Sequence, residues 1–393
     1  MKTINEIKTD IDTLIRKQGN QGAIKLGDVL DDIVDIVQTG FQEVNNTLDK
    51  FKAQITNVAT FHTAVPNTAT EIVFAFLGDV DLTGYTKSGS IGDGIDVYAN
   101  GTKYAVVSSK IICAPENSAE FFNDYSALAT LDLTNFDTSN VTNMSGMFSG
   151  CAALTTLDLS NFNTANVTDF NNMFYGCSSL TSLDLSNFNT ANATSFASMF
   201  YECFELASLD VSNFDTANAT SFASMFYECF ELASLDVSNF DTANATSFAS
   251  MFCECYALTT LDLSNFDTAN ATSFASMFYN CNMLASLDVS NFDTANATSF
   301  EYMFFGCNAL TTLDLSNFDT ANATSFECMF AYNASLVTII AKDWNANVTS
   351  SLMFNLSTSL VGGNGTTYDA DHTDASYAHI DVADNPGYFT APA

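Results

Sequence analysis

The sequence predicts an α/β repeat solenoid, in which stacked copies of one unit form a parallel β-sheet on one side and short helical returns on the other. Nine consecutive copies share a fixed period of 26 residues, and residues 151–176 are typical of them. Each copy contains Leu-x-Leu or a close variant, whose apolar residues alternate as in a strand with one buried face. This period lies in the range of leucine-rich solenoids, whose single copies cannot bury their apolar face alone.

The second half of each copy predicts the return path. In residues 194–203, TSFASMFYEC, apolar side chains recur at spacings of three and four, which favours a short helix or helical turn behind the sheet. The Thr/Asn run at 215–220 predicts the connecting turn. Stacking at about 4.8 Å would align equivalent residues in columns. Residues 204–229 and 230–255 differ only at Tyr227 and Cys253, which indicates duplication of a unit rather than tuning of each one.

Residues 1–57 predict an α-helical coiled coil for oligomerisation or attachment. From Leu30 onward, apolar residues recur at alternating spacings of four and three, which gives four heptads with both core positions apolar. A single amphipathic helix packed on the end of the array is the alternative. Phe at core positions, with Ile33 and Ile36 widening the stripe, favours three strands over two, so we expect a homotrimer. The expected oligomerisation residues are Leu30, Val34, Val37, Phe41, Val44, Leu48, Phe51 and Ile55.

Two further segments are predicted to cover the ends of the array, which itself is expected to span residues 115–360. Residues 58–114 show β-branched and aromatic alternation around Asn100-Gly101, a strong hairpin signal, and predict a small β-rich adaptor and N-terminal cap. Residues 361–393 predict a C-terminal cap, because a solenoid end exposes its core unless it is covered. The side chains expected over the last coil are Tyr368, Tyr377, Ile380 and Tyr388.

The charge distribution restricts the classes of partner. The chain has 11 Lys+Arg against 45 Asp+Glu, and none of the basic residues lies between Lys110 and Lys342. Nucleic-acid binding through phosphate neutralisation is therefore not expected, whereas a cationic partner is compatible with the array. No stretch approaches the roughly 20 apolar residues of a membrane span. The N-terminus, MKTINEIKTDIDTLIRKQGN, lacks the apolar core of a signal peptide.

The cysteines predict buried free thiols. Seven of the 10 occupy one repeat position, and such a column is typical of small buried apolar residues rather than of a disulfide ladder, for which seven is an odd number. Only Cys253-x-Cys255 approaches the paired spacing of a zinc site, so we expect no metal there. The equivalent cysteines are Cys151, Cys177, Cys203, Cys229, Cys255, Cys281 and Cys307.

An aspartate column is the main candidate for a ligand-binding surface. Each aspartate lies between two inward Leu or Val residues and so should point outward from the sheet, together with Thr156, Ser160 and their equivalents. Stacked carboxylates repel one another. Two effects could offset this repulsion: bridging by Ca²⁺, or solvation together with hydrogen bonds to Ser and Thr hydroxyls. After Asp132, the candidate residues are Asp158, Asp184, Asp210, Asp236, Asp262, Asp288 and Asp314.

Other polar motifs favour structural roles. Asn-x-Thr triplets at Asn140, Asn166 and Asn192 match glycosylation acceptors, but their regular period favours a turn-forming asparagine ladder. The acidic and His-containing run at 369–381 suggests a solvated cap, with cation binding as the alternative. No nucleophile–base pair, phosphate-binding loop or HExxH motif is present, so no catalytic residue and no enzymatic activity are expected.

The repeat resembles a known family. LDLTNFDTSNVTNMSGMFSGC at 131–151 is similar to the BspA-like leucine-rich repeats of bacterial surface proteins, and residues 361–390 are similar to the segment that closes many such arrays. The resemblance covers roughly residues 115–390. It implies a solenoid with an adhesive or recognition role, and it brings no catalytic residues.

These expectations combine into one functional hypothesis. An adhesive array on an oligomerising N-terminal stalk, without an export signal, resembles a bacteriophage virion fibre of the head or tail. Such a fibre would attach to a capsid or tail protein at its N-terminus, bind a host surface protein or glycan, and need no membrane insertion. The alternatives are a BspA-like adhesin at the bacterial cell surface and a structural spacer without a ligand.

Overall fold

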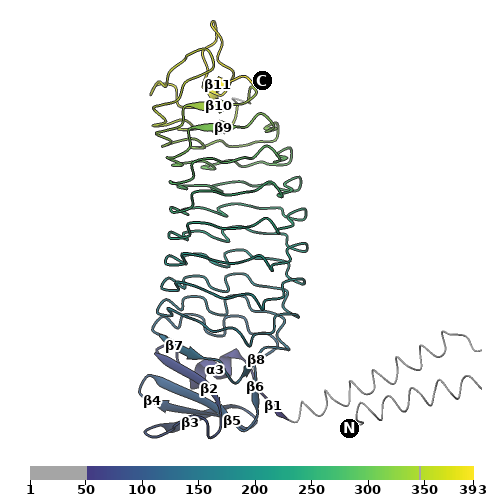
Figure 1. The fold of residues 1–393 in the computed structure, drawn as a ribbon, viewed down its shortest axis with the longest axis vertical. Coiled ribbons are helices and arrows are strands. Elements are labelled where there is room, and N and C mark those ends of the chain that lie inside the picture. Colours follow the sequence, from purple (N-terminus) through teal and green to yellow (C-terminus); the bar gives the residue numbers. More distant parts are fainter. Residues whose placement is uncertain (1–50, 345–346) are drawn as a thin grey trace, which may run out of the picture.

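The computed structural model describes residues 51–344 and 347–393. Figure 1 shows a tall stack of coils that rises from a β-rich adaptor, with the strands β9, β10 and β11 at the opposite end. The predicted repeat array is therefore present. The predicted heptad positions from Leu30 to Leu48 lie outside the described residues.

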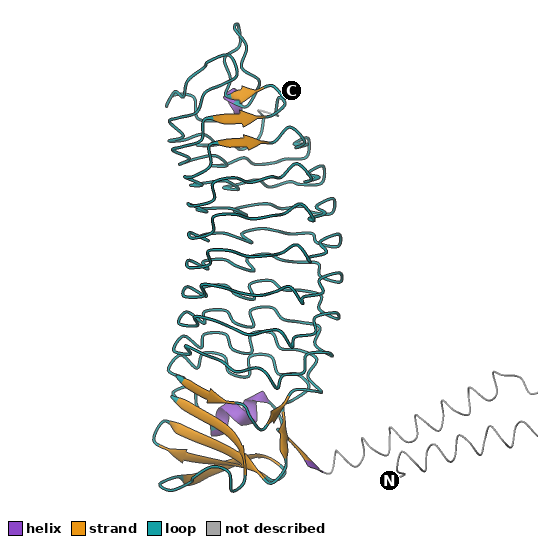
Figure 2. Cartoon of the chain, in the orientation of Figure 1, coloured by secondary structure: helices purple, strands orange, loops and turns teal. Residues whose placement is uncertain are grey.

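The adaptor is built from six strands and one short helix. Figure 2 shows it at the end of the array opposite the C-terminus, with strands in orange and the helix in purple. Strands β4 (Ile95–Asn100) and β5 (Lys103–Ser108) form the hairpin predicted at Asn100-Gly101, and Gly101 takes a positive φ of 63° in its turn. The other elements are β1 (Lys52–Gln54), α3 (Val58–Ala64), β2 (Glu71–Phe76), β3 (Thr86–Gly92) and β6 (Ile111–Cys113).

The last residues of the predicted coiled coil belong to the adaptor instead. The boundary that we predicted between these two segments, after residue 57, therefore lies too late in the chain. Residues 52–54 form strand β1, which pairs with β6. Ile55 is fully buried and bridges to Gly92, whereas Phe51 is 61% exposed. The heptad spacing continues into this segment, but strand pairing and burial in the adaptor core determine its conformation. Ile55 therefore does not lie in a helical seam.

The adaptor covers the first coil by continuing its backbone pairing. Strand β2 pairs in parallel with β7 (Thr130–Asp132), the first Leu-x-Leu segment, and β6 pairs in parallel with β8 (Phe136–Asp137). Phe61 on α3 stacks on Phe121 of the array at a centroid distance of 4.3 Å. The adaptor thus takes the place of a preceding coil and hides the apolar end of the stack.

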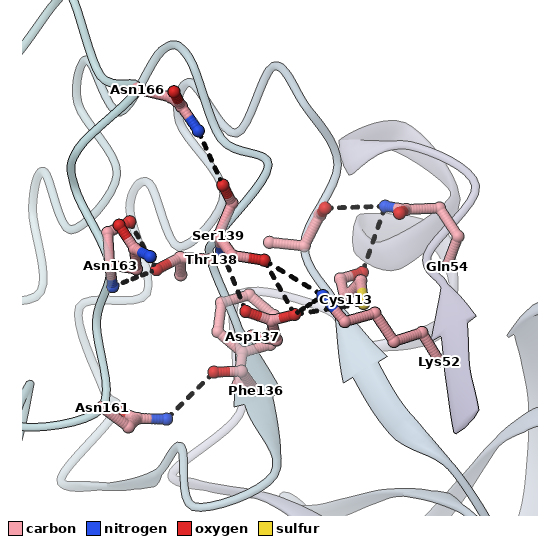
Figure 3. A network of polar contacts seen from close by, with 11 residues as sticks. Lys52, Gln54, Cys113, Phe136, Asp137, Thr138, Ser139, Asn161, Asn163 and Asn166 are labelled. Carbon is pink, nitrogen blue, oxygen red and sulfur yellow. Dashed lines mark hydrogen bonds and ion pairs between the residues drawn. The ribbon is translucent and has the colours of Figure 1, made fainter. Parts of the chain in front are cut away.

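A polar network secures this junction (Figure 3). Lys52 Nζ lies 2.6 Å from Asp137 Oδ2 and donates a hydrogen bond to Ser139 Oγ. Burial raises the pKa of Asp137, but hydrogen bonds from Lys52 and Ser139 outweigh it and hold that pKa below its usual value. Gln54 Nε2 donates to the carbonyl oxygens of Cys113 and Ala114. The network ties β1 to the β6 segment and to the first coil.

Stacked phenylalanines fill the interior of the array. The Phe residues of Met-Phe lie one above another as near-parallel rings, with Phe200 and Phe226 at a centroid distance of 5.7 Å. A second column, which includes Phe196 and Phe222, repeats at 6.0 Å. These rings are fully buried, and the Leu-x-Leu side chains pack beside them. The columns expected from the period are confirmed.

The return segments are chains of turns, not helices, which corrects the sequence prediction. Ser198 and Glu202 both adopt a left-handed conformation, with φ of 55° and 56°, so no regular helix can form between them. Alternate N–H groups donate to the next coil instead: Ser198 N to Ala223 O, and Phe200 N to Met225 O, both at 2.9 Å. The same geometry recurs along the stack.

The predicted continuous parallel sheet is also corrected. Within the described array, regular strands appear only at its ends, at β7, β8, β9 (Thr312–Asp314) and β10 (Thr338–Ile340). Beside the Leu-x-Leu segments of the middle coils, the backbone hydrogen bonds between coils are long, such as Thr181 N to Thr155 O at 3.5 Å. The interior rings repeat at 5.7–6.0 Å, more than the roughly 4.8 Å of paired strands. Stacked rings and long backbone contacts therefore replace regular strand pairing in the middle coils.

Buried threonines and exposed asparagines supply the missing links between coils. The Thr216 hydroxyl donates to Asp241 O at 2.9 Å and accepts from Asp241 N at 2.8 Å. Asn213 Nδ2 donates to Leu185 O and Phe188 O of the preceding coil. Asn218, one of the glycosylation-like triplets, donates to Ala191 O in the same manner. The asparagine ladder expected from the sequence is therefore confirmed.

All 10 cysteines are buried free thiols, as predicted. Each of the seven equivalent thiols donates to a main-chain carbonyl of the preceding coil, for example Cys177 Sγ to Phe148 O at 3.2 Å. Burial raises the pKa of Cys177 to about 12. These thiols should consequently be both inaccessible and protonated at neutral pH.

We expect these seven thiols to react with a disulfide-exchange reagent at pH 8 only after the chain is unfolded. Titration with dithionitrobenzoate, with and without guanidinium chloride, checks this. Rapid reaction of the native chain, with mass spectrometry locating the label on the column cysteines, would contradict the buried geometry.

The C-terminal cap adds one more strand and seals the last coil. Strand β11 (Phe389–Thr390) pairs in parallel with β10, and a 3₁₀ turn, η2, spans Ala375–Tyr377. Tyr388 is fully buried against Phe354, and Tyr368 and Tyr377 pack on the same core. Ile380 is half-buried and bridges to Phe389. The cap residues expected from the sequence thus lie at the last coil.

Candidate ligand-binding surface

The predicted aspartates form one exposed row on the Leu-x-Leu face of the array. Each lies between two buried or partly buried side chains; Asp210, for example, lies between Leu209 and Val211, which are 8% and 1% exposed. Alternation of side chains along the segment turns every such aspartate outward, although regular strand pairing is absent there. The row therefore lies where the sequence predicted it.

A long open groove of about 1100 Å³ runs along this row. We call it the aspartate–serine groove. It is lined by Asp184, Asp210, Asp236, Asp262 and Asp288, together with Ser182, Ser208, Ser234, Ser286, Thr260 and the edges of the intervening leucines. A smaller hollow of about 310 Å³ extends it to Asp158. Asp314 lies on β9 and lines neither hollow.

Hydrogen bonds within each coil stabilise the carboxylates. Asp210 Oδ1 accepts from the N–H of Ser212 at 2.9 Å, and the same geometry recurs at the other aspartates of the groove. Hydrogen bonds from the backbone and hydroxyl of this serine lower the pKa of Asp210, and they outweigh the repulsion from Asp184 and Asp236. The groove is therefore fully anionic at neutral pH.

The surroundings of the groove define what it can bind. The surface offers carboxylate and hydroxyl acceptors, hydroxyl donors and narrow apolar edges, repeated once per coil. Because the sequence has no Lys or Arg between Lys110 and Lys342, no basic side chain of the coils that line the groove neutralises it. Neutral polyhydroxylated or cationic ligands of extended shape match this chemistry, and polyanions do not.

The row of aspartates also bears on the calcium bridging that the sequence left open. Across residues 51–344 and 347–393, no group of three or more His, Cys, Asp or Glu side chains is placed to hold a metal ion. The serine hydrogen bonds supply the alternative explanation for the stacked charges.

The sequence analysis missed a set of aromatic residues on the return face. Tyr175, Tyr201 and Tyr227 stack on one another with centroid distances of 4.6 and 4.3 Å, and all three are partly exposed. Phe204, Phe230 and Tyr256 form a second partly exposed stack beside the cysteine column in the sequence. Both sets follow the 26-residue period, so the signal that could have revealed them was present in the sequence.

The fold and the groove define a class of protein: a repeat array, closed at both ends, with a periodic acidic surface. The sequence profile described as "Mycoplasma protein of unknown function, DUF285" matches residues 116–232, 202–287 and 261–363. These overlapping matches span well over half of the chain, which belongs to this family, and they agree with a BspA-like repeat array. Comparisons with curated proteins and with solved structures return no match. Among the described residues, no helix has the length and apolar character needed to cross a membrane.

Proposed function

We propose that the chain is a fibre protein of a bacteriophage virion whose array attaches to a host surface through the aspartate–serine groove, with a glycan as the favoured ligand. The observation that carries this proposal is the repetition of one acceptor-rich surface in successive coils. An extended ligand can engage several such coils at once, so weak contacts would add up along its length. The role is binding rather than catalysis.

Two further features support a fibre. Both ends of the stack are covered, by β2 and β6 at one end and by β11 at the other, which favours a soluble rod rather than an open-ended polymer. The heptads from Leu30 to Leu48 favour a trimeric stalk that would connect the rod to a capsid or tail protein. Trimerisation would present three grooves to one surface.

The stalk is tested by the mass of the full-length chain in solution. We expect a trimer for the parent and a monomer with an intact array for the double variant Val37→Asp, Val44→Asp, because buried carboxylates disrupt a coiled-coil seam. Light scattering gives the mass and circular dichroism the fold. A monomeric parent would instead favour a BspA-like adhesin at the bacterial cell surface, the role that the resemblance of the repeat implies.

The groove is tested by removing its charge in the central coils. We expect the triple variant Asp210→Asn, Asp236→Asn, Asp262→Asn to lose at least tenfold in binding to an array of bacterial surface glycans, because carboxylates are stronger hydrogen-bond acceptors than amides. The matched control is Asp215→Asn, Asp241→Asn, Asp267→Asn. It alters three exposed carboxylates of the same coils outside the groove. Equal losses in the two triple variants would argue against the groove.

A further inference from the structure

The tyrosine stack of the return face ends at a notch. Tyr175 is its first ring, and one face of that ring lies on Tyr201. The equivalent positions in the two preceding coils are occupied by Ser149 and Asn123, so no ring covers the other face. At the opposite end of the stack, Tyr227 meets the buried Cys253. One face of the Tyr175 ring is therefore not stacked on another ring.

A hollow of about 250 Å³ lies where the next rings would continue the stack. We call it the Tyr175 notch. Its lining residues come from three successive coils, in the order Glu120 and Asn123, then Ser145, Gly146 and Ser149, then Asn172 and Tyr175. Because the coils stack in sequence order and Tyr201 lies beyond Tyr175, the uncovered face of Tyr175 borders the hollow.

The notch combines one aromatic wall with a polar rim. Glu120 and Asn172 are exposed, and Asn123, Ser145 and Ser149 are half-buried, so carboxylate, amide and hydroxyl groups surround the ring. Asn123 Nδ2 donates to Asp124 Oδ2, which leaves its amide oxygen as an acceptor. The left-handed backbone at Glu120, Gly146 and Asn172 repeats in register, which makes the rim part of the coil geometry.

We infer that the Tyr175 notch binds one uncharged hexopyranose ring, either free or as a residue of a glycan. A pyranose has an apolar face of C–H groups that stacks on an aromatic ring, and a perimeter of hydroxyls that exchange hydrogen bonds with amides and carboxylates. The hollow has room for one such ring. The acidic rim and the absence of Lys and Arg from residues 111–341 oppose uronic and sialic acids. This inference concerns a face of the array other than the aspartate–serine groove, and it does not require the fibre role.

The test uses the full-length chain and a panel of methyl glycosides of glucose, galactose, mannose and N-acetylglucosamine, with glucuronate as the anionic probe and benzyl alcohol as the aromatic one. We expect saturation-transfer NMR to show contact with the ring C–H protons of one or more neutral glycosides, at millimolar affinity. Tyr175→Ala should weaken that binding at least tenfold, because the stacking platform is lost. Ser149→Tyr should block it by adding a ring to the stack, in a geometry that Tyr175 and Tyr201 already adopt.

The controls separate the notch from the rest of the surface. Tyr256→Ala removes a partly exposed ring from the other stack, and the groove triple variant removes charge from the other face; both should bind the glycoside as the parent does. Thermal melting checks that each variant folds. Absence of binding by every neutral glycoside, parent-like binding by Ser149→Tyr, or preference for benzyl alcohol would overturn the inference. If the groove triple variant loses binding in the groove but still binds the glycoside in the notch, the two proposals are distinguished.

Discussion

Replacing Phe226 by alanine is expected to lower the free energy of unfolding by about 3–5 kcal/mol, the usual range for a large buried aromatic side chain. Phe226 is fully buried and stacks between Phe200 and Phe252, at centroid distances of 5.7 and 5.8 Å. Its removal leaves a cavity between two coils that are held apart by rings on either side, so collapse of the site is restricted. The loss of stability should arise at the interfaces between this coil and its two neighbours.

The matched control is Phe230→Ala in the next coil. Phe230 also stacks between two rings, Phe204 and Tyr256, but it is partly exposed, so its loss should cost about 1 kcal/mol. Guanidinium denaturation of both variants gives the comparison, and hydrogen exchange locates the weakened coils. Equal effects of the two substitutions would show that the interior rings do not set the stability of the stack.

Replacing Asp381 by alanine is expected to release the C-terminal cap and to lower stability by about 2–4 kcal/mol, because several hydrogen bonds to one charged group are lost together. Asp381 is only 5% exposed. Its carboxylate accepts from the N–H groups of Asn364 and Thr366 at 2.8 and 3.0 Å, and from the Thr366 hydroxyl at 2.6 Å. These bonds join the loop after the last coil to the strand-like segment before β11. Increased proteolysis after residue 361, with the central coils still protected, is the expected readout.

The cap should also respond to acid. Burial raises the pKa of Asp381, but hydrogen bonds from Thr366, Asn364 and Gly387 outweigh burial, and the net pKa lies below the usual value. A lowered folded-state pKa means that this stabilisation is complete above the unfolded pKa of about 4 and is lost as the pH falls through the folded value. The Asp381→Asn variant should show a smaller loss of cap protection between about pH 5 and pH 2 than the parent. An unchanged pH profile in the variant would contradict this role.

The columns of the array could be predicted from the sequence because every copy repeats the same pattern. A buried Leu, Phe or Cys at one position implies equivalents at intervals of 26 residues, and burial of Phe226, Cys229 and Leu232 follows this rule. The outward direction of the aspartates and the asparagine ladder were predicted for the same reason. Periodicity therefore identifies which residues share an environment.

The conformation of the return could not be predicted in the same way. Apolar spacings of three and four are shared by helices and by a chain of turns, and Ser198 and Glu202 are not residues that demand a positive φ. A signal was nevertheless present. Gly146, Gly150, Gly176 and Gly306 fall at these two positions in other copies, and glycine adopts the left-handed conformation without steric cost. Comparison between copies, rather than within one, would have indicated the turns.

The two candidate sites also differ in how far the sequence alone could predict them. The groove depends on what the coils share, so its aspartates could be named from the sequence. The Tyr175 notch depends on where one copy departs from the next, since Ser149 and Tyr175 occupy equivalent positions. The structural effect of such a difference between copies can be judged only when it is known which side chains stack on one another.

The near identity of residues 204–229 and 230–255 has a consequence for the gene as well as for the fold. Apart from Tyr227 and Cys253, these two coils present the same contact surface to the coil below and to the coil above. A chain with one coil more or fewer could therefore keep nearly all of its interfaces and both caps. Unequal crossing-over between the two nearly identical segments would therefore yield folded proteins that differ only in length. The reach of the rod could change in whole steps by recombination, without any new residue having to be selected.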